Sequence, residues 1–238
     1  MARILVVIPA YNEEKNIVRV ITELKSDFPE ADILVVNDCS KDNTAVVAKN
    51  AGVVCVSHPF NMGYAHGLLT GFKYAAKENY DIVVQFDGDG QHIASEARML
   101  ADTLINEKVD IVIGSRFLID TGFKHPFFRR IGTALFRTII NMTCKKDITD
   151  PTSGLQAVSK SCIIRFAQME GYPEYPDANL LIDLLLDGYR IVERSVKMRI
   201  RTEGVSMHSG IWKPARYMML MFYSIFIVNI KQRKLKKA

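Results

Sequence analysis

Residues 81–92 read Asp81-Ile82-Val83-Val84-Gln85-Phe86-Asp87-Gly88-Asp89-Gly90-Gln91-His92. The first half is a short, β-branched apolar run, which is typical of a buried strand. The second half places two carboxylates two residues apart, with glycines that let the backbone turn. Mg²⁺ and Mn²⁺ bind one or two protein carboxylates and complete their coordination with water and substrate phosphates. The stretch therefore predicts a metal and diphosphate site at the end of a strand; the alternative is a turn that only begins the next helix.

Short β-branched runs alternate with segments of helical period on both sides of this stretch. The expected strands are 4–8, 33–36, 53–57, 82–86 and 111–114. One helix is expected to begin near Glu13, and three more are expected over 43–50, 63–78 and 94–106. This alternation predicts an α/β fold with a mostly parallel central sheet and helices on both faces. Ligands of such sheets bind at the carboxyl ends of the strands. Polar motifs follow three of the strands, at 9–13, 37–40 and 87–89.

Beyond Arg116 the pattern becomes that of an amphipathic helix over about 127–143. Its apolar residues recur at helical spacing, at Ile131, Leu135, Ile139 and Met142. Arginines and other polar residues fall on the opposite side. Such a helix either faces a membrane or packs on the core as an ordinary surface helix. Two more helices are expected near 161–168 and 178–186, followed by a strand at 190–196.

The C-terminal segment 211–230 is apolar and ends in a basic cluster. Its uncharged part, 217–228, would cover about 18 Å as a helix, which is short of the roughly 30 Å of hydrocarbon in a bilayer. Trp212 and Tyr217 at one end and lysines at the other suit a helix that lies in the membrane interface. The alternative is a buried C-terminal helix or an oligomer contact. We expect a catalytic domain over 1–210 and a membrane-associating tail over 211–238.

The charge of the chain is concentrated at its C-terminus. The 31 Lys and Arg residues and 26 Asp and Glu residues give a net charge of +5, and five cations lie in the last eight residues: Lys231, Arg233, Lys234, Lys236 and Lys237. This arrangement disfavours nucleic acid as a partner and favours an anionic membrane surface. The four cysteines form no metal-binding or disulfide pattern, which suits a reducing cytoplasm.

Six motifs occur in the order found in family 2 glycosyltransferases: Ile8-Pro9-Ala10-Tyr11-Asn12-Glu13-Glu14, Val36-Asn37-Asp38-Cys39-Ser40-Lys41-Asp42-Asn43-Thr44, Asn61-Met62-Gly63, Asp87-Gly88-Asp89-Gly90-Gln91-His92, Gly114-Ser115-Arg116 and Asp150-Pro151-Thr152-Ser153-Gly154. Within that family the chain most resembles the polyprenyl-phosphate sugar transferases related to dolichol-phosphate mannose synthase. The resemblance implies a GT-A fold, a nucleotide diphosphate sugar donor, a divalent cation (Mg²⁺ or Mn²⁺) and inversion at the anomeric carbon.

The resemblance also assigns roles to residues. It implies that the nucleotide sugar is held by Pro9, Ala10, Tyr11, Asn12, Glu13, Asp38, Gly63, Asp87, Gly88, Asp89 and Arg201. The metal would be held by Asp87, Asp89 and Gln91. The acceptor phosphate would be held by Arg116, Arg129 and Thr133, with Arg130 as the substitute if the register shifts by one. Asp89, Arg116 and Arg129 are then the catalytic residues, and Arg201 belongs to a basic loop that closes over the diphosphate.

The chain departs from the family pattern at two positions, Asn37 where Asp is common and Cys39 where Gly is common, which leaves recognition of the base open. The better-known relatives carry transmembrane helices that have no clear counterpart in this chain. We expect attachment at the cytoplasmic face of the cell membrane, alone, with a small membrane-protein partner or as a homo-oligomer. The expected donor is UDP-glucose or UDP-N-acetylglucosamine, and the expected acceptor is undecaprenyl phosphate, for cell-envelope glycan synthesis.

The class of acceptor decides whether a general base is needed. A lipid phosphate is largely ionised at neutral pH and needs neutralisation, which guanidinium groups supply without taking up a proton. A sugar hydroxyl would need a base, and Asp150 or Asp177 is the candidate. Each also has a structural interpretation, Asp150 as the organiser of a turn and Asp177 as a helix N-cap. His208 is a further candidate metal ligand, or else an ordinary loop residue.

Other functions fit the sequence less well. A dinucleotide-dependent oxidoreductase would carry GxGxxG after the first strand, where this chain has Pro9-Ala10-Tyr11-Asn12-Glu13. A nucleotidyltransferase would carry a basic glycine-rich loop there. A non-catalytic nucleotide-sugar-binding protein on the same fold stays open, because a fold does not fix a function.

Overall fold

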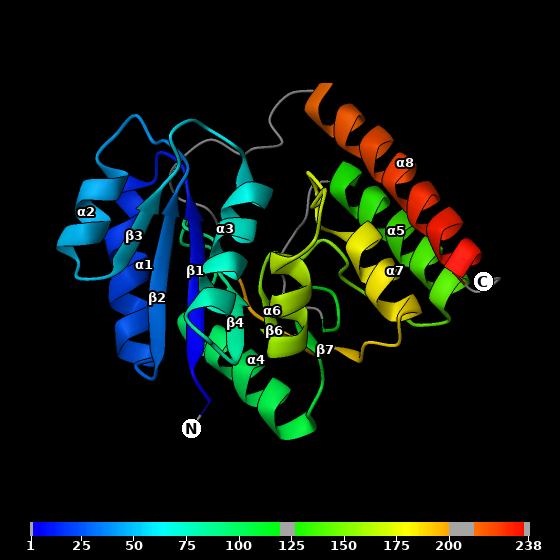
Figure 1. The fold of residues 1–238 in the computed structure, drawn as a ribbon, viewed down its shortest axis with the longest axis horizontal. Coiled ribbons are helices and arrows are strands. Elements are labelled where there is room, and N and C mark those ends of the chain that lie inside the picture. The colour runs from blue at the N-terminus through cyan, green and yellow to red at the C-terminus, as the bar shows by residue number, and fades with distance from the viewer. Residues whose placement is uncertain (1, 120–126, 200–211, 236–238) are drawn as a thin grey trace.

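The computed structural model of the chain describes residues 2–119, 127–199 and 212–235 (Figure 1). A seven-stranded sheet of order β3-β2-β1-β4-β6-β5-β7 forms its centre. The strands are β1 (Ile4–Ala10), β2 (Ala31–Asn37), β3 (Val54–Ser57), β4 (Ile82–Gln85), β5 (Ile111–Ser115), β6 (Gln156–Ser159) and β7 (Ile191–Ser195). Every strand expected from the sequence is present close to its expected bounds.

The register of the sheet brings the expected site motifs to one edge. β1 is parallel to both β2 and β4, so that Val7 pairs with Leu34 on one side and with Gln85 on the other. β5 has the same direction as β4, because β6 lies between them and is antiparallel to both. The carboxyl ends of β1, β2, β4 and β5 therefore all face the same way, as does the start of β6.

β6 is a strand that the sequence did not predict. Its four residues begin one residue after the Asp150–Gly154 turn and are followed immediately by a helix, so no alternating pattern can develop. It forms because the chain returns between β4 and β5, where Gln156 pairs with both Gln85 and Ile113. The sheet is mostly parallel, as predicted, with this single reversed strand.

Helices cover both faces of the sheet. They are α1 (Glu14–Asp27), α2 (Thr44–Asn50), α3 (Tyr64–Lys77), α4 (Ala94–Glu107), α5 (Phe127–Cys144), α6 (Lys160–Ala167), α7 (Ala178–Leu186) and α8 (Trp212–Leu235). Alternate residues of β1 feed two cores, since Val7 packs in one with Phe72 of α3 and Val6 in the other with Ile17 of α1. Strands buried on both faces read as continuous apolar runs, which explains why they were visible in the sequence.

Three helices, α5, α7 and α8, gather beside the sheet, with α8 alongside the other two (Figure 1). The ring of Phe136 on α5 contacts Tyr217 and Phe222 on α8. Polar contacts join α7 to α8, since Asn179 donates to Ser224 and the Gln232 amide donates to Asp183 and Asp187. α5 and α7 lie where the sequence predicts them, and α8 continues five residues beyond Ile230.

The outer face of α8 is apolar. Its exposed side chains include Met219, Phe222, Tyr223, Phe226, Ile227 and Ile230. We call these six residues the outer face of α8. In the parts of the chain that the structure describes, no helix combines the length and the apolarity that a membrane crossing requires.

Candidate active site

The turns after β1 and β2 are tied together at the carboxyl edge of the sheet. The backbone N–H of Asn12 donates to Ser40 Oγ at 2.9 Å, and that of Glu13 donates to Thr44 Oγ1 at 2.8 Å. In the other direction, the Lys41 N–H donates to Asn12 Oδ1 at 2.8 Å. These bonds hold the 9–13 segment as a fixed rim on which Tyr11 is 42% exposed. The predicted donor-binding residues Pro9, Ala10, Tyr11, Asn12 and Glu13 thus lie at the edge where ligands of such sheets bind.

Asp38, after β2, is buried and bound entirely within the chain. Its Oδ1 accepts from His58 Nδ1 and from the Met62 N–H, both at 2.8 Å, and its Oδ2 accepts from the Gly63 N–H at 2.7 Å. The carboxylate therefore fixes the loop that leads into α3. The sequence resemblance assigns Asp38 to the nucleoside. Both of its oxygens are bound within the chain, and the role in holding the nucleoside stays a prediction.

The loop held by Asp38 ends in Gly63 and Tyr64. Gly63 has a φ of +90°, a region in which a side chain would be strained, and it immediately precedes α3. The Tyr64 hydroxyl donates to Asp87 Oδ1 at 2.9 Å. Burial and the nearby Asp87 carboxylate raise the pKa of Tyr64 well above its usual value, so that the phenol remains a donor. The loop thereby connects Asp38 to the acidic segment after β4.

His92 contacts Asp87 from the other side. The Asp87 N–H donates to His92 Nδ1 at 3.1 Å, so Nδ1 is the acceptor nitrogen of the ring and Nε2 is the nitrogen that carries a proton. Nε2 lies 3.5 Å from Asp87 Oδ2. The ring is 2% exposed and meets the edge of Phe86 at a centroid distance of 5.2 Å. Asp87 Oδ1 therefore accepts a hydrogen bond from Tyr64, His92 Nε2 lies near Oδ2, and the Asp87 side chain stays 30% exposed.

Asp89 and Gln91 complete the acidic segment. Asp89 Oδ1 accepts from the Gln91 N–H at 3.0 Å. The Gln91 carbonyl accepts from the Arg199 N–H at 2.8 Å, and the Gln91 amide donates to the Arg199 carbonyl at 3.2 Å. Arg199 in turn pairs with Glu23 of α1. Burial raises the pKa of Glu23, but its bonds to Arg199 and to the Ala94 N–H outweigh that and leave it lowered.

The residues of this segment fit a divalent cation held jointly with a diphosphate. Asp87 and Asp89 are both partly exposed, and carboxylate oxygens are the hard ligands that Mg²⁺ and Mn²⁺ take. Among the described residues, no three Asp, Glu, His or Cys side chains are grouped closely enough to hold a metal by themselves. A site with only two carboxylates needs further ligands, and substrate phosphate oxygens are the usual source.

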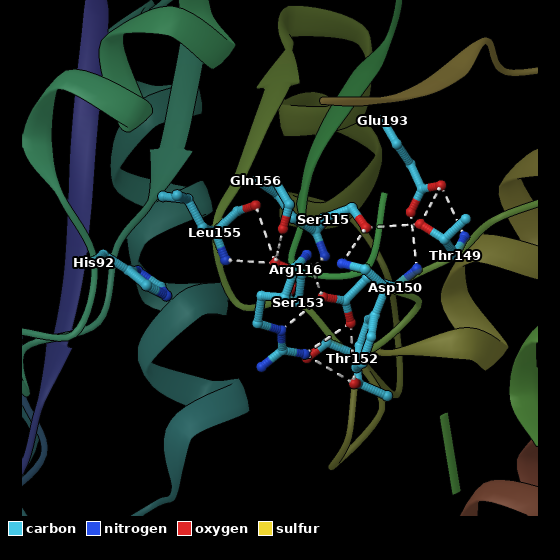
Figure 2. A network of polar contacts seen from close by, with 12 residues as sticks. His92, Ser115, Arg116, Thr149, Asp150, Thr152, Ser153, Leu155, Gln156 and Glu193 are labelled. Carbon is cyan, nitrogen blue, oxygen red and sulfur yellow. Dashed lines mark hydrogen bonds and ion pairs between the residues drawn. The ribbon is translucent and has the colours of Figure 1, made fainter. Parts of the chain in front are cut away.

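Arg116, after β5, forms a buried ion pair with Asp150 (Figure 2). Its Nε and Nη2 donate to the two Asp150 oxygens at 2.6 and 2.7 Å, and its N–H donates to Oδ2 at 3.1 Å. Nη2 also meets the carbonyl and hydroxyl oxygens of Thr152 at 3.2 Å. Burial alone would lower the pKa of Arg116, but Asp150 outweighs it and the pKa is raised. The guanidinium is therefore permanently charged and held in one orientation.

Glu193 of β7 binds the backbone at Thr149 and Asp150, on the side of Asp150 away from Arg116 (Figure 2). It accepts from the N–H groups of Thr149 and Asp150 at 2.7 and 2.8 Å. Burial raises the pKa of Glu193, and the neighbouring Asp150 charge adds to that effect. Asp150 is fully buried with both oxygens engaged, so the structural interpretation of this residue is favoured over a general base. The Asp150 carboxylate makes its main contacts with Arg116 and not with the turn in which it lies.

Asp177 precedes α7, as an N-cap would, but its side chain makes no capping hydrogen bond. Its Oδ2 instead accepts from the Tyr217 hydroxyl of α8 at 2.8 Å. The charge of Asp177 also acts on Tyr64, Tyr172 and Arg116, which places it close to the site. Asp177 therefore occupies the N-cap position, as predicted, but its side chain does not cap α7 and instead anchors α8.

Several predicted residues cannot be related to this geometry. The side chains of Arg129 and Arg130 lie outside the described residues, as do Arg201 and His208. Thr133 is buried on α5, and within the described chain no hydrogen bond joins it to Arg116. Conversely, the sequence missed Tyr64, His58 and Glu193. The only signal for Tyr64 was its place directly after the Asn61-Met62-Gly63 motif.

Comparison with known proteins adds independent evidence. The sequence model of the family described as Glycosyl transferase family 2 matches residues 5–165. An uncharacterised protein of Methanocaldococcus jannaschii is 36% identical over 157 residues, 66% of this chain, and the chain spans 64% of that protein's length. A UDP-N-acetylglucosamine–dolichyl-phosphate N-acetylglucosaminyltransferase of Methanococcus voltae is 33% identical over 67% of this chain and 70% of its own length.

A more distant relative matches over a longer part of the chain. The polyprenol monophosphomannose synthase of Mycolicibacterium smegmatis is 28% identical over 87% of this chain and 82% of its own length. Among solved structures, a glucosyl-3-phosphoglycerate synthase of Mycobacterium tuberculosis in complex with Mn²⁺, UDP and phosphoglyceric acid superimposes with a TM-score of 0.66. It covers 97% of this chain and 78% of its own chain at 19% identity, so this likeness concerns the fold.

Proposed function

Because the chain belongs to glycosyl transferase family 2, we propose that it moves a sugar from a nucleotide diphosphate sugar to a polyprenyl phosphate, with inversion at the anomeric carbon. One observation supports this most strongly. The acidic segment at Asp87 lies at the same edge of the sheet as the 9–13 rim, Asp38 after β2 and Arg116 after β5. A negatively charged donor and a negatively charged acceptor would meet there.

The donor would lie across the ends of β1, β2 and β4. Tyr11, exposed on the rim, offers a ring face to the base. Asp87, Asp89 and Gln91 would hold a divalent cation against the diphosphate, and when bound this cation would neutralise the charge that develops on the leaving nucleoside diphosphate. Gln91 is paired with Arg199, two residues before Arg201, which is consistent with the proposal that Arg201 closes over the diphosphate.

The acceptor phosphate would bind at Arg116. Because Asp150 engages Nε and Nη2, the third nitrogen, Nη1, would meet the phosphate; within the described residues Nη1 has no hydrogen-bond partner. Asp150 also compensates the charge of Arg116, so the remaining positive charge must come from elsewhere. We assign that to Arg129, with Thr133 as a further ligand. No general base is required for an ionised phosphate, which agrees with an Asp150 carboxylate already bound on both oxygens.

The polyprenyl class of the lipid is proposed from the named relatives, and the choice of sugar and of undecaprenyl phosphate from the sequence resemblance. One is named for UDP-N-acetylglucosamine and dolichyl phosphate, the other for a polyprenol monophosphomannose product. Both names contain a polyprenyl lipid, whereas the sugars differ. UDP-N-acetylglucosamine or UDP-glucose with undecaprenyl phosphate is the first pair to test, in the setting of cell-envelope glycan synthesis.

A lipid acceptor requires access to a membrane, and we assign this to the C-terminal part of the chain. The outer face of α8 is apolar, and the sequence places a basic cluster at the end of the same helix. A helix of this kind lies in the interface of an anionic membrane without crossing it. In this proposal 1–210 is the catalytic domain, 211–238 attaches it to the cytoplasmic face, and a membrane-protein partner or a second copy is an alternative contact for the same face.

The test is a transfer assay with purified protein, Mn²⁺, labelled UDP-sugars and undecaprenyl phosphate in vesicles. We expect label in the lipid extract and UDP release that both depend on the lipid phosphate, and loss of both in Asp89→Asn. Equal UDP release by the wild type and Asp89→Asn would overturn the enzymatic proposal. Transfer to a sugar hydroxyl, with none to the lipid phosphate, would overturn the proposed acceptor.

A further inference from the structure

Two residues that contact Asp87 have no part in the proposed chemistry. Tyr64 reaches Asp87 from the first turn of α3, and His92 reaches it from the end of the acidic segment. The two contacts are on different oxygens, 2.9 Å from the Tyr64 hydroxyl to Oδ1 and 3.5 Å from His92 Nε2 to Oδ2. The hydrogen bond on one oxygen and the neighbouring imidazole at the other together restrict rotation of the Asp87 carboxylate.

We infer that Tyr64 and His92 are positioning residues that aim the Asp87 carboxylate at the cation and diphosphate. This rests on the proposed function, since it concerns the same site. Neither residue would touch substrate. Each carboxylate oxygen can accept about two hydrogen bonds or metal contacts, so one donor on each leaves room for a ligand on the exposed side.

The two donors are themselves held by the fold. His92 is buried against Phe86, and its Nδ1 accepts from the Asp87 backbone, so its ring cannot turn without breaking that bond. Tyr64 follows Gly63, whose N–H is bound to Asp38 Oδ2 at 2.7 Å. The Asp38 carboxylate thus fixes the backbone of the loop that ends at Gly63. This loop fixes the position of Tyr64, and the Tyr64 hydroxyl in turn orients the Asp87 carboxylate. This sequence of contacts links the loop after β2 to the segment after β4.

Gly154 closes the arrangement from the β6 side. A Cβ at this position would lie 3.0 Å from Asp87 Oδ2, 3.3 Å from Oδ1 and 3.3 Å from the Tyr64 hydroxyl. A side chain there would push on both members of the Tyr64–Asp87 hydrogen bond. The backbone at Gly154 is anchored on both sides, since Ser153 Oγ donates to the Gly114 carbonyl at 2.7 Å and the Gly114 N–H donates to the Leu155 carbonyl at 2.9 Å. The close approach is therefore built into the turn before β6.

The experiment measures metal-dependent nucleotide binding and needs no acceptor. UDP is titrated into the full-length protein by calorimetry without metal and at increasing Mn²⁺ concentrations. For Tyr64→Phe, which removes only the hydroxyl, we expect the apparent Mn²⁺ affinity in the presence of UDP to fall about 10-fold or more, the usual effect of losing a group that orients a metal ligand. UDP affinity without metal should stay within about twofold, and saturating Mn²⁺ should restore binding.

The chain offers a matched control. Tyr80 also donates its hydroxyl to an aspartate, Asp32, at 2.8 Å, but on another part of the fold. Tyr80→Phe should leave both affinities unchanged. His92→Asn keeps an acceptor for the Asp87 N–H but has no atom that reaches Asp87 Oδ2; because that contact is the longer one, we expect a smaller loss of Mn²⁺ affinity than in Tyr64→Phe.

The outcomes separate this inference from the proposed function. Equal Mn²⁺ affinities in the wild type and Tyr64→Phe would overturn the positioning role alone. An equal loss of UDP binding with and without Mn²⁺ would also overturn it, because the hydroxyl would then serve general structure. UDP binding by the wild type that is indifferent to Mn²⁺ would overturn the metal site and this inference together. Mn²⁺-dependent UDP binding without transfer to a lipid phosphate would leave the inference standing and overturn only the acceptor.

Discussion

The carboxyl edge of the sheet and the α5–α7–α8 group achieve order in different ways. At the sheet edge, backbone N–H groups of one loop are bound by side chains of another, as in Glu13 with Thr44 and Gly63 with Asp38. In the helix group, side chains of one element bind side chains of another, as in the hydrogen bond from Tyr217 to Asp177. The first arrangement fixes the backbone of the loops and hence the orientation of the carboxylates that they carry. The second attaches a helix whose other face remains apolar and exposed.

The contrast fits the two tasks that we propose for the chain, binding of a diphosphate with a cation and contact with a lipid. A diphosphate and a cation need ligands held to within a fraction of an ångström, because orientation is a large part of catalysis. A lipid needs an apolar surface with little requirement for exact position. We therefore expect substitutions at the sheet edge to change affinity and turnover, and substitutions on the outer face of α8 to change membrane recovery. The following substitutions test that division, from the largest expected effect to the smallest.

Asp89→Asn should cause the largest loss. Removing one of two carboxylates from the proposed metal site should lower transfer by about a hundred- to a thousandfold, comparable to removing a group that stabilises transition-state charge. Initial rates at saturating Mn²⁺ and donor provide the measurement, and circular dichroism checks that the fold is kept. Activity within a few-fold of the wild type would mean that Asp89 is not a ligand.

Asp150→Asn should cost about 3–5 kcal/mol of unfolding free energy, because it leaves the buried Arg116 guanidinium without a counter-charge. Urea denaturation gives the value. The control is Asp147→Asn, which breaks a bidentate pair with Arg137 whose side chains are 45% and 55% exposed. There we expect about 0–1 kcal/mol. Equal costs at the two positions would show that burial of the Arg116 pair has no energetic consequence.

Phe226→Ser should weaken binding to anionic vesicles and spare the catalytic edge. If the ring is buried in the interface, its loss corresponds to about 1.5–3 kcal/mol, or roughly ten- to hundredfold in partitioning. Vesicle sedimentation measures this, and UDP binding should not change. Val46→Ser on α2, also exposed, is the control and should leave partitioning unchanged. If the two variants partition alike, the outer face of α8 does not contact the membrane.

Gly154→Ala should have the smallest effect of the four substitutions, and its effect should be confined to metal-dependent UDP binding. The added methyl would lie against the Tyr64–Asp87 hydrogen bond, so we expect a several-fold to roughly 10-fold rise in the Mn²⁺ concentration needed for half-maximal UDP binding. Gly171→Ala cannot serve as its control, because Gly171 has a φ of +68° and would be strained. Tyr80→Phe serves instead, and a normal Mn²⁺ requirement in Gly154→Ala would show that the turn before β6 can yield.

The sequence was sufficient for the family, the α/β fold and the edge of the sheet at which the candidate site residues gather. Buried parallel strands are continuous apolar runs, so β1, β2 and β4 could be recognised, and the motifs after them marked the edge. The family assignment is confirmed by the match over residues 5–165. β6 was missed because four residues between a turn and a helix carry no periodic pattern.

The partners of the site carboxylates could not be predicted. Asp38 is bound by residues 20 to 25 positions away, and Arg116 pairs with Asp150 34 positions away, so neither spacing nor periodicity relates them. The sequence could name Asp150 as either base or structural residue, and only its burial and pairing favour the second. Asp177 occupies the position of an N-cap, yet its side chain binds α8, a contact that depends on how two distant helices pack.

The most direct test of the account is a crystal structure of the full chain with Mn²⁺ and UDP, recorded at a wavelength where manganese scatters anomalously. We expect one anomalous peak within coordination distance of the diphosphate and of at least one carboxylate from Asp87 and Asp89. UDP bound at the sheet edge with no anomalous peak beside these two residues would contradict it.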